Sequence, residues 1–349
     1  MSNVVSLGLP RRLDLAERQG LLIGNFACNR RSPDDVFWLK ENAEVLNVLA
    51  SSGAMLPESA LAPYRRVYDG LDERLRFFPQ YYRFLLSICL DLEDLGFGSG
   101  KGTDLCRWVA KMGLVEAELS DLQRAEAQRL LKRRGVGSED MMLKERLHRF
   151  INRSETFTLP NKKAAYELTH IVFYLSDYGL IDPYLEDAAI ASLEFAGLLA
   201  YLDQDIDLLA EICVAMRFAG KRPSAIWEDW IAQDMGGFVL KADGPQGSDA
   251  YHEYLVTCWW AQFADRPSFP GEAQSTGLYV QRHSARKGPL RAMSEYMFHL
   301  GPARNNDWSQ MRAAMTDAVG EDGEDILSGA EQSSDRFDAF FESFARADS

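Results

Sequence analysis

Six glycines end the strongest helical patterns of this chain, and their spacing is nearly even. With Ala264 taken as the place of one further stop, successive stops lie 37 to 44 residues apart. Glycine commonly ends a helix because it adopts the left-handed conformation without steric cost. Each interval also holds a second helical pattern, so the chain is predicted to consist of helical hairpins of about 40 residues. The stops are Gly53, Gly96, Gly135, Gly179, Gly220 and Gly301.

Three of the helix endings also match by residue type. They read SICLDLEDLG (87–96), HIVFYLSDYG (170–179) and EICVAMRFAG (211–220), each with isoleucine eight residues before its glycine. A single hairpin cannot bury its apolar face alone, whereas stacked hairpins can. The expected fold is therefore all-α, with about six or seven hairpins. We favour closure into an α/α toroid with inner and outer helices, and an open HEAT-like α-solenoid is the alternative.

Three regions are predicted along the chain. Residues 1–31 read as an irregular N-terminal arm, residues 32–305 as the hairpin domain, and residues 306–349 as an acidic helical segment. The only strand-like piece is 237–242, and the longest loop is 265–288. This loop and the phenylalanine-rich terminal helix are the segments expected to seal a closed ring.

Charge and cysteine usage narrow the class of protein. The net charge is −14, and residues 316–349 carry ten acidic and two basic side chains. Such a charge disfavours nonspecific binding to nucleic acids or anionic membranes. The five cysteines are scattered without a CxxC motif, as in a reducing compartment. We see no signal peptide and no apolar run of about 18 residues, so a cytoplasmic protein is expected.

One helical pattern, residues 161–179, carries the leading candidate site. Glu167 and His170 lie three residues apart, so they share a helix face. Glu-x-x-His can supply a carboxylate and an imidazole to one metal ion. The structural interpretation is that the histidine donates to a neighbouring group. In the aligned endings Ser87 and Glu211 take the place of His170, which suggests a shared polar site on the inner helices, either an acid–base pair or a ligand shell.

The remaining candidates admit structural interpretations as well. Asp203, Asp205 and Asp207 resemble the front of a calcium loop but lack its glycine and final glutamate, so a helix cap is expected. Trp259 and Trp260 lie in an aromatic zone that fits a ligand pocket or a packed core. Glu145 and His148 repeat the three-residue spacing, whereas Glu295 and His299 lie four residues apart, and a structural role is expected for both pairs. Asp91, Glu93 and Asp94 gather near one helix end as candidates for binding a cation or a basic partner, with a solvated face as the favoured interpretation.

Two segments resemble known sequences. The segments 117–135 (AELSDLQRAEAQRLLKRRG) and 166–179 (YELTHIVFYLSDYG) resemble an uncharacterised family of all-helical bacterial proteins, found chiefly in marine alphaproteobacteria. The second segment is also similar to helical proteins of actinomycetes. The resemblance implies an all-α, cytoplasmic bacterial protein and brings no activity with it. Its shared residues are Thr169, His170, Asp177 and Gly179.

No strong catalytic motif is present. The chain lacks a glycine-rich phosphate loop, His-Glu-x-x-His and Gly-x-Ser-x-Gly. We therefore expect a helical-repeat protein that binds a peptide, a protein or a small molecule in a concave or central cavity. Ser87, Thr169, Trp259 and Trp260 are the candidate ligand residues. The alternative is a metal- or acid–base-dependent enzyme that uses Glu167 and His170, with Glu211 and Asp177 as further candidates; no cofactor is strongly implied, and the oligomeric state stays open.

Overall fold

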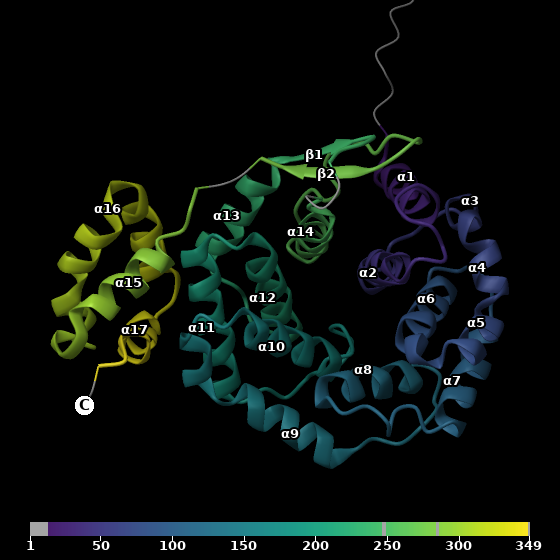
Figure 1. Cartoon of the computed structure of the whole chain (residues 1–349), viewed down its shortest axis with the longest axis horizontal. Helices are drawn as coiled ribbons and strands as arrows, with labels where there is room; N and C mark the ends of the chain where they lie inside the picture. The colour runs from purple at the N-terminus through teal and green to yellow at the C-terminus, as the bar shows by residue number, and fades with distance from the viewer. Residues whose placement is uncertain (1–12, 246–248, 284–285, 348–349) are drawn as a thin grey trace, which may run out of the picture.

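The computed structural model describes residues 13–245, 249–283 and 286–347. The described chain is predominantly helical, which confirms the all-α prediction (Figure 1). Its α-helices are α1 (Leu15–Cys28), α2 (Val36–Ser51), α3 (Glu58–Leu61), α4 (Arg65–Asp69), α5 (Leu71–Phe77), α6 (Tyr82–Asp94), α7 (Lys101–Lys111), α8 (Asp121–Lys132), α9 (Met141–Ile151), α10 (Lys162–Leu175), α11 (Asp187–Asp203), α12 (Ile206–Phe218), α13 (Ala225–Met235), α14 (Tyr251–Phe263), α15 (Leu290–Leu300), α16 (Trp308–Ser333) and α17 (Phe337–Ala345). Short 3₁₀ turns are η1 (Ala62–Tyr64), η2 (Pro79–Tyr81), η3 (Ser154–Thr158) and η4 (Gly301–Ala303), and the strands are β1 (Phe238–Lys241) and β2 (Tyr279–Arg282).

Side-chain caps and glycine stops explain where many of these helices begin and end. The side chains of Asp35, Ser120, Asp140, Asn161 and Asp205 each accept a hydrogen bond from the first turn of the helix that follows. These bonds satisfy backbone donors that lack a partner within the helix. All six stop glycines have positive φ, between 51° and 89°. The prediction of glycine-assisted helix ends is thus confirmed at the backbone level.

Alternate helices form an inner and an outer layer, as Figure 1 shows. The inner helices α2, α6, α8, α10, α12 and α14 each contact the next one in this order, and α14 also contacts α2. Helices α7, α9, α11 and α13 lie outside and connect successive inner helices. The most buried inner helix is α12, in which every residue except Arg217 is buried. The inner helices therefore contribute a large share of the core, and a buried polar side chain on them requires a partner to offset the cost of its burial.

The prediction of an irregular arm is wrong for residues 15–28, which form helix α1. The side chain of Asp14 accepts from the Glu17 backbone N–H, and the Glu17 carboxylate accepts from the Asp14 N–H. This capping box outweighs the two glycines inside the helix. Gly20 also has a packing role, because a Cβ there would lie 3.2 Å from the Cβ of Ala60. Residues 1–12 of the predicted arm lie outside the described residues.

The long loop and the terminal helix take different positions from those expected. Loop 265–288 contains strand β2, which pairs antiparallel with β1, and the loop accepts hydrogen bonds from α1. One of these runs from Asn25 Nδ2 to the Gln274 carbonyl at 2.8 Å. The phenylalanine-rich helix α17 instead packs on α11, α16 and η3, on the far side of the molecule from α1 (Figure 1). The expectation that α17 seals a ring is therefore wrong.

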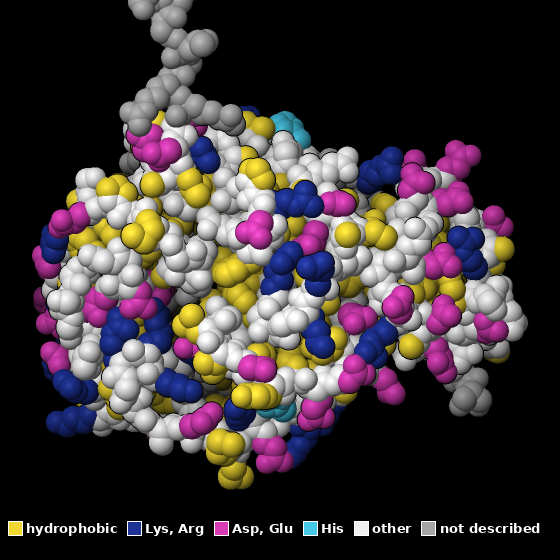
Figure 2. Space-filling view, turned by 180° about the vertical axis from the view of Figure 1, so that it is seen from behind, with side chains coloured by type: hydrophobic (Ala, Val, Ile, Leu, Met, Phe, Trp, Pro, Cys, Tyr) yellow, Lys and Arg dark blue, Asp and Glu magenta, His cyan; other side chains and the backbone are white. Residues whose placement is uncertain are grey.

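Helices α15–α17 form the acidic C-terminal part of the chain. Acidic side chains gather over this part of the surface, on the right in Figure 2. Phe337, Phe340, Phe341 and Phe344 of α17 are buried, and Phe340 lies 6.0 Å from Phe195 of α11 between ring centroids. These aromatic contacts fasten the segment to the outer layer. Within the described residues, no helix is both long enough and apolar enough to cross a membrane.

Candidate functional site

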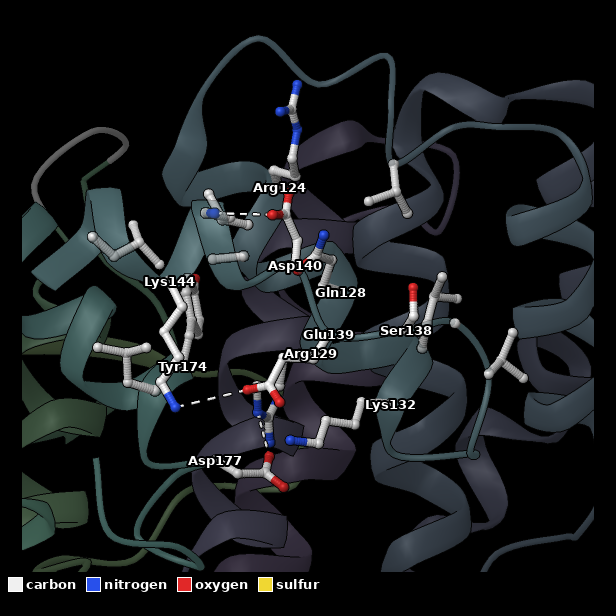
Figure 3. Close-up of a pocket in the computed structure, with 18 of the residues that line it drawn as sticks. Arg124, Gln128, Arg129, Lys132, Ser138, Glu139, Asp140, Lys144, Tyr174 and Asp177 are labelled. Carbon is white, nitrogen blue, oxygen red and sulfur yellow. Dashed lines mark hydrogen bonds and ion pairs between the residues drawn. The ribbon is translucent and has the colours of Figure 1, made fainter. Parts of the chain in front are cut away.

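A cavity of about 690 Å³ lies between α8, α9 and the end of α10 (Figure 3). We call it the α8–α10 cavity. Pockets for small molecules are usually about 300–1,000 Å³, with apolar walls and a few polar groups that converge on the ligand. The apolar part of the wall includes Val115, Ala125, Leu131, Leu143, Leu147 and Ile181, and charged and polar side chains line the rest.

An ion pair crosses the cavity wall from α8 to the end of α10. The Nε of Arg129 lies 2.6 Å from Oδ1 of Asp177, and the guanidinium stacks over the Tyr178 ring at 4.2 Å from its centroid. The Arg129 side chain is only 11% exposed, so water screens the pair weakly. Figure 3 shows both side chains directed toward each other in the cavity. The cavity thus presents a fixed cation and a fixed anion on one wall.

The backbone that holds Asp177 in place is strained. Asp177, Tyr178 and Gly179 have φ values of 47°, 56° and 87°, three left-handed residues in succession. The first two are not glycine, and each such residue costs about 1 kcal/mol. Helix α10 therefore ends at Leu175, and not at Gly179 as the glycine pattern predicts. Strain of this kind concentrates at binding and active sites.

Two lysines add positive charge to the same cavity. The Nζ of Lys144 lies 3.7 Å from Oε1 of Glu139, which neutralises it in part. Lys132 forms no ion pair with any residue that the structure describes. In Figure 3 its ammonium end is turned toward Arg129 and Asp177. The cavity is lined by four cationic and four carboxylate side chains, and Lys132 and Arg124 are the cations among them that form no ion pair with a described residue.

A second group of titratable side chains lies on the inner helices. We call it the His252 cluster: Glu44 from α2, His170 from α10, Asp207 and Glu211 from α12, and His252 from α14. Nδ1 of His252 lies 3.5 Å from Oε2 of Glu44, and its Nε2 lies 3.6 Å from Oδ1 of Asp207. Oε2 of Glu211 lies 3.9 Å from Nδ1 of His170. The cluster therefore links four inner helices through charge.

Hydroxyl groups complete much of the hydrogen bonding in the His252 cluster. Each carboxylate accepts one bond from a hydroxyl: Glu44 from Tyr251 at 3.0 Å, Asp207 from Tyr166 at 2.6 Å and Glu211 from Thr169 at 2.6 Å. Two buried atoms, Oδ1 of Asp207 and Nδ1 of His252, have no hydrogen-bond partner. Oδ1 of Asp207 faces Nε2 of His252, and Nδ1 of His252 faces Oε2 of Glu44. Both distances are slightly too long for a hydrogen bond.

Burial and charge shift the pKa values within the cluster. Burial lowers the pKa of His252, but the Glu44 and Asp207 carboxylates outweigh burial and raise it to about 9. Burial raises the pKa of Asp207 and of Glu211 above the ordinary carboxyl values, against the opposing effect of the histidines. Burial also acts on Glu44, yet its interactions with His252 leave its pKa below the ordinary value. His252 is therefore a cation at neutral pH.

The structure separates the two members of the leading pair. Oε1 of Glu167 lies 3.7 Å from Nζ of Lys163, whereas His170 faces Glu211. His170 thus pairs with Glu211, the residue that occupies the equivalent position in the aligned ending of the next inner helix, α12. Thr169 also joins Glu211, so three predicted residues meet in the His252 cluster. Asp177 is the predicted residue that lines the α8–α10 cavity.

The other candidate ligand residues lie away from the cavity. Ser87 Oγ donates to Asp91 Oδ2 at 3.0 Å on α6. Trp259 and Trp260 are 4% and 0% exposed, and their indole N–H groups donate to Ser51 and Glu228. Both tryptophans therefore belong to the packed core.

The remaining polar motifs have structural partners. Glu145 and Glu295 pair with arginines on their own helices, at 2.8 Å each, and not with the nearby histidines. Asp205 caps α12, as expected. The interpretation of Asp91, Glu93 and Asp94 as a solvated face is wrong, because Arg133 and Arg134 of α8 pair with them. Among the described residues, no group of three or more His, Cys, Asp or Glu side chains is placed to hold a metal ion.

Sequence reasoning missed the residues that complete both sites. Arg129 belongs to a basic stretch with no motif, and only its contact with Asp177 singles it out. Glu44 and His252 are 208 positions apart, so no local pattern joins them. Asp207 was visible in the run of aspartates, yet its role as a partner of His252 depends on how α14 packs against α12. Long-range packing carries this information, and a single sequence does not.

One comparison with known proteins identifies a family. A family model described as "Domain of unknown function (DUF6902)" matches residues 1–347, so the chain belongs to this family. The expected membership of an uncharacterised family is confirmed, while the bacterial origin stays a prediction. No curated protein and no solved structure matches the chain.

Proposed function

We propose that this member of the DUF6902 family binds a small molecule in the α8–α10 cavity. The observation that carries the proposal is the cavity itself, about 690 Å³ with a wall of apolar and charged side chains. Its size is typical of small-molecule sites, and its wall offers both an apolar surface and polar groups that can orient a ligand. Of the ligands expected from sequence, a small molecule suits such a cavity better than a peptide or a protein partner does.

The lining has equal numbers of cationic and acidic side chains, and the two cations that lie beside each other, Lys132 and Arg129, favour an amphipathic ligand with an anionic group at that place. Asp177 neutralises Arg129, whereas Lys132 has no ion-pair partner among the described residues. An anionic group beside Lys132 and Arg129 gains two charge-assisted contacts in a weakly screened place. The apolar wall then covers the rest of the ligand. The strained segment at Asp177 supports this proposal, because it positions the acidic partner of Arg129 at this wall.

Binding of the dye 8-anilinonaphthalene-1-sulfonate tests the proposal, because the dye combines aromatic rings with a sulfonate. Ala110 is exposed and lines the cavity, so Ala110→Trp fills the space without disturbing the core. We expect saturable dye fluorescence with the folded wild type and a loss of affinity of about tenfold or more in Ala110→Trp. The matched control is Ala313→Trp, an exposed position on α16. Equal affinity in all three proteins would contradict the proposal.

A second candidate function, an acid–base enzyme, rests on His170. Its Nδ1 lies 2.6 Å from the Tyr166 carbonyl oxygen, which can only accept. Nδ1 therefore carries the proton, and Nε2 presents a lone pair when the ring is neutral. Glu211 takes the place expected of Glu167 beside this ring. Diethyl pyrocarbonate, which reacts with open neutral imidazoles, should modify His170 near neutral pH; an unmodified His170 in the folded protein removes this candidate.

We also propose that the helices close into an α/α toroid and that the protein is located in the bacterial cytoplasm, as expected from the sequence. The circuit of inner helix contacts, with α14 against α2, supports a closed α/α toroid over an open solenoid. The five cysteines are free thiols, and only Cys28 is exposed. Unpaired thiols support a reducing compartment such as the bacterial cytoplasm.

A further inference from the structure

His252 lies where the two ends of the inner-helix circuit meet. It belongs to the first turn of α14, which packs on α2 on one side and on α12 on the other. Its two ring nitrogens face a carboxylate from each neighbour, Glu44 at 3.5 Å and Asp207 at 3.6 Å. The imidazole therefore links α14 both to α2, near the start of the chain, and to α12.

Only the doubly protonated ring suits this position. An imidazolium has an N–H on both nitrogens and can donate to both carboxylates. A neutral ring keeps one N–H, so its other nitrogen presents a lone pair to a carboxylate oxygen. Oδ1 of Asp207 is buried and accepts no hydrogen bond, so the facing N–H of His252 at 3.6 Å is the group that offsets its charge. Loss of the proton thus places two acceptors against each other in a shielded site.

The other charged groups around His252 do not replace its proton. From α2, Lys40 lies 3.6 Å from Glu44 but is 49% exposed. From α12, Asp207 and Glu211 both add negative charge. From α10, Tyr166 donates to Asp207 and His170 faces Glu211, and from α14 itself Tyr251 donates to Glu44. Glu253 of α14 is directed to Arg282 of β2 at 3.6 Å. His252 is therefore the cation that lies between Glu44 and Asp207.

We propose that His252 is a proton-operated clasp that fastens α14 to α2 and α12, so that loss of its proton loosens the junction between the two ends of the inner-helix circuit. This device is independent of the α8–α10 cavity, since no residue of the cluster lines that cavity.

The direction of the pH effect follows from linkage. The folded protein raises the pKa of His252 to about 9, above the ordinary value of 6.5. The stabilisation is therefore complete below about pH 6.5 and is lost as the pH rises through about 9. The raised pKa values of Asp207 and Glu211 act in the same direction, since these groups lose protons as the pH rises. The clasp is thus closed at neutral pH and opens in mild alkali.

Hydrogen–deuterium exchange of the full chain tests the clasp. We expect wild-type protection of peptides from α2 and α14 to fall about tenfold between about pH 7 and about pH 9.5, after correction for intrinsic exchange. Peptides from α11, which lies outside the junction, serve as the internal reference. His252→Gln should already show the lower protection at pH 7 and little further change. The matched control His299→Gln, on exposed α15 surface, should behave as wild type.

Two outcomes overturn the clasp. The first is equal wild-type protection of α2 and α14 at both pH values. The second is a His252→Gln protein that keeps the wild-type pH response. Should His252→Gln fail to fold, Glu44→Gln replaces it, because this variant removes one carboxylate while keeping an acceptor for Tyr251. A wild-type pH response in Glu44→Gln likewise contradicts the proposal.

Discussion

At the scale of single residues, Gly179 shows how one position serves both backbone and packing. Its φ of 87° favours glycine, and a Cβ there would lie 2.6 Å from Cδ1 of Phe218. It follows the strained pair Asp177 and Tyr178, whose side chains both contact Arg129. The tight turn after α10 thus places the Asp177 carboxylate at the cavity, and Phe218 packs against the backbone of the same turn at Gly179.

Replacement of Gly179 by alanine should therefore destabilise the protein more than a helix-ending glycine elsewhere. Left-handed strain costs about 1–2 kcal/mol, and displacing Phe218 adds about 1–3 kcal/mol. The matched control is Gly220→Ala, where φ is 68° and a Cβ meets nothing within 4 Å. Denaturant unfolding should show a loss for Gly179→Ala at least about 1 kcal/mol greater than for the control. Equal losses would mean that the contact with Phe218 relaxes freely.

At the scale of elements, a polar cap before an amphipathic run marks several helix starts in the sequence. The helix cap expected among Asp203, Asp205 and Asp207 is Asp205, which caps α12. Helix α1 stands where an irregular arm is expected, because the capping box of Asp14 and Glu17 starts a helix despite its two glycines. Strand β2 escaped because a four-residue strand is held by its pairing with β1, about 40 positions earlier.

Arg133 shows what fastens one inner helix to the next. It extends from α8 to α6, where it pairs with Asp91 and Asp94 at 2.7 Å each. Asp91 is only 1% exposed, so loss of the arginine leaves a buried carboxylate with the Ser87 hydroxyl as a donor but without its cation. Arg133→Met should therefore lower the free energy of unfolding by about 3 kcal/mol.

The control for this prediction is an exposed ion pair of the same kind. Arg107 lies 3.2 Å from Asp104, and both side chains are more than two-thirds exposed. Arg107→Met should change the free energy of unfolding by less than about 0.5 kcal/mol. A similar small effect in both variants, measured by denaturant unfolding, would show that Asp91 is not effectively buried.

At the scale of the whole molecule, the even spacing of stop glycines predicted the helical class, but not which helices meet. The junction of α2 with α14 unites residues about 200 positions apart, and the His252 cluster exists only because of it. Several residues of the two candidate sites can be predicted from the sequence, namely His170, Glu211, Thr169 and Asp177. Their partners Arg129, Glu44 and His252 emerge only from packing.

The proposed closure of the inner helices into a ring predicts the size of the molecule. A compact chain of this length has a radius of gyration of about 20 Å. Small-angle X-ray scattering of the monomer should give a value close to this, with a single peak in the distance distribution. A clearly larger radius with an elongated distribution would favour the open solenoid over the closed α/α arrangement.

A crystal structure of the protein soaked with 8-anilinonaphthalene-1-sulfonate tests ligand binding in the α8–α10 cavity most directly. We expect density for the dye between α8, α9 and the end of α10, with its rings against Ala125 and Leu143 and its sulfonate toward Lys132 and Arg129. An empty α8–α10 cavity in crystals that hold the dye elsewhere would contradict the proposed function.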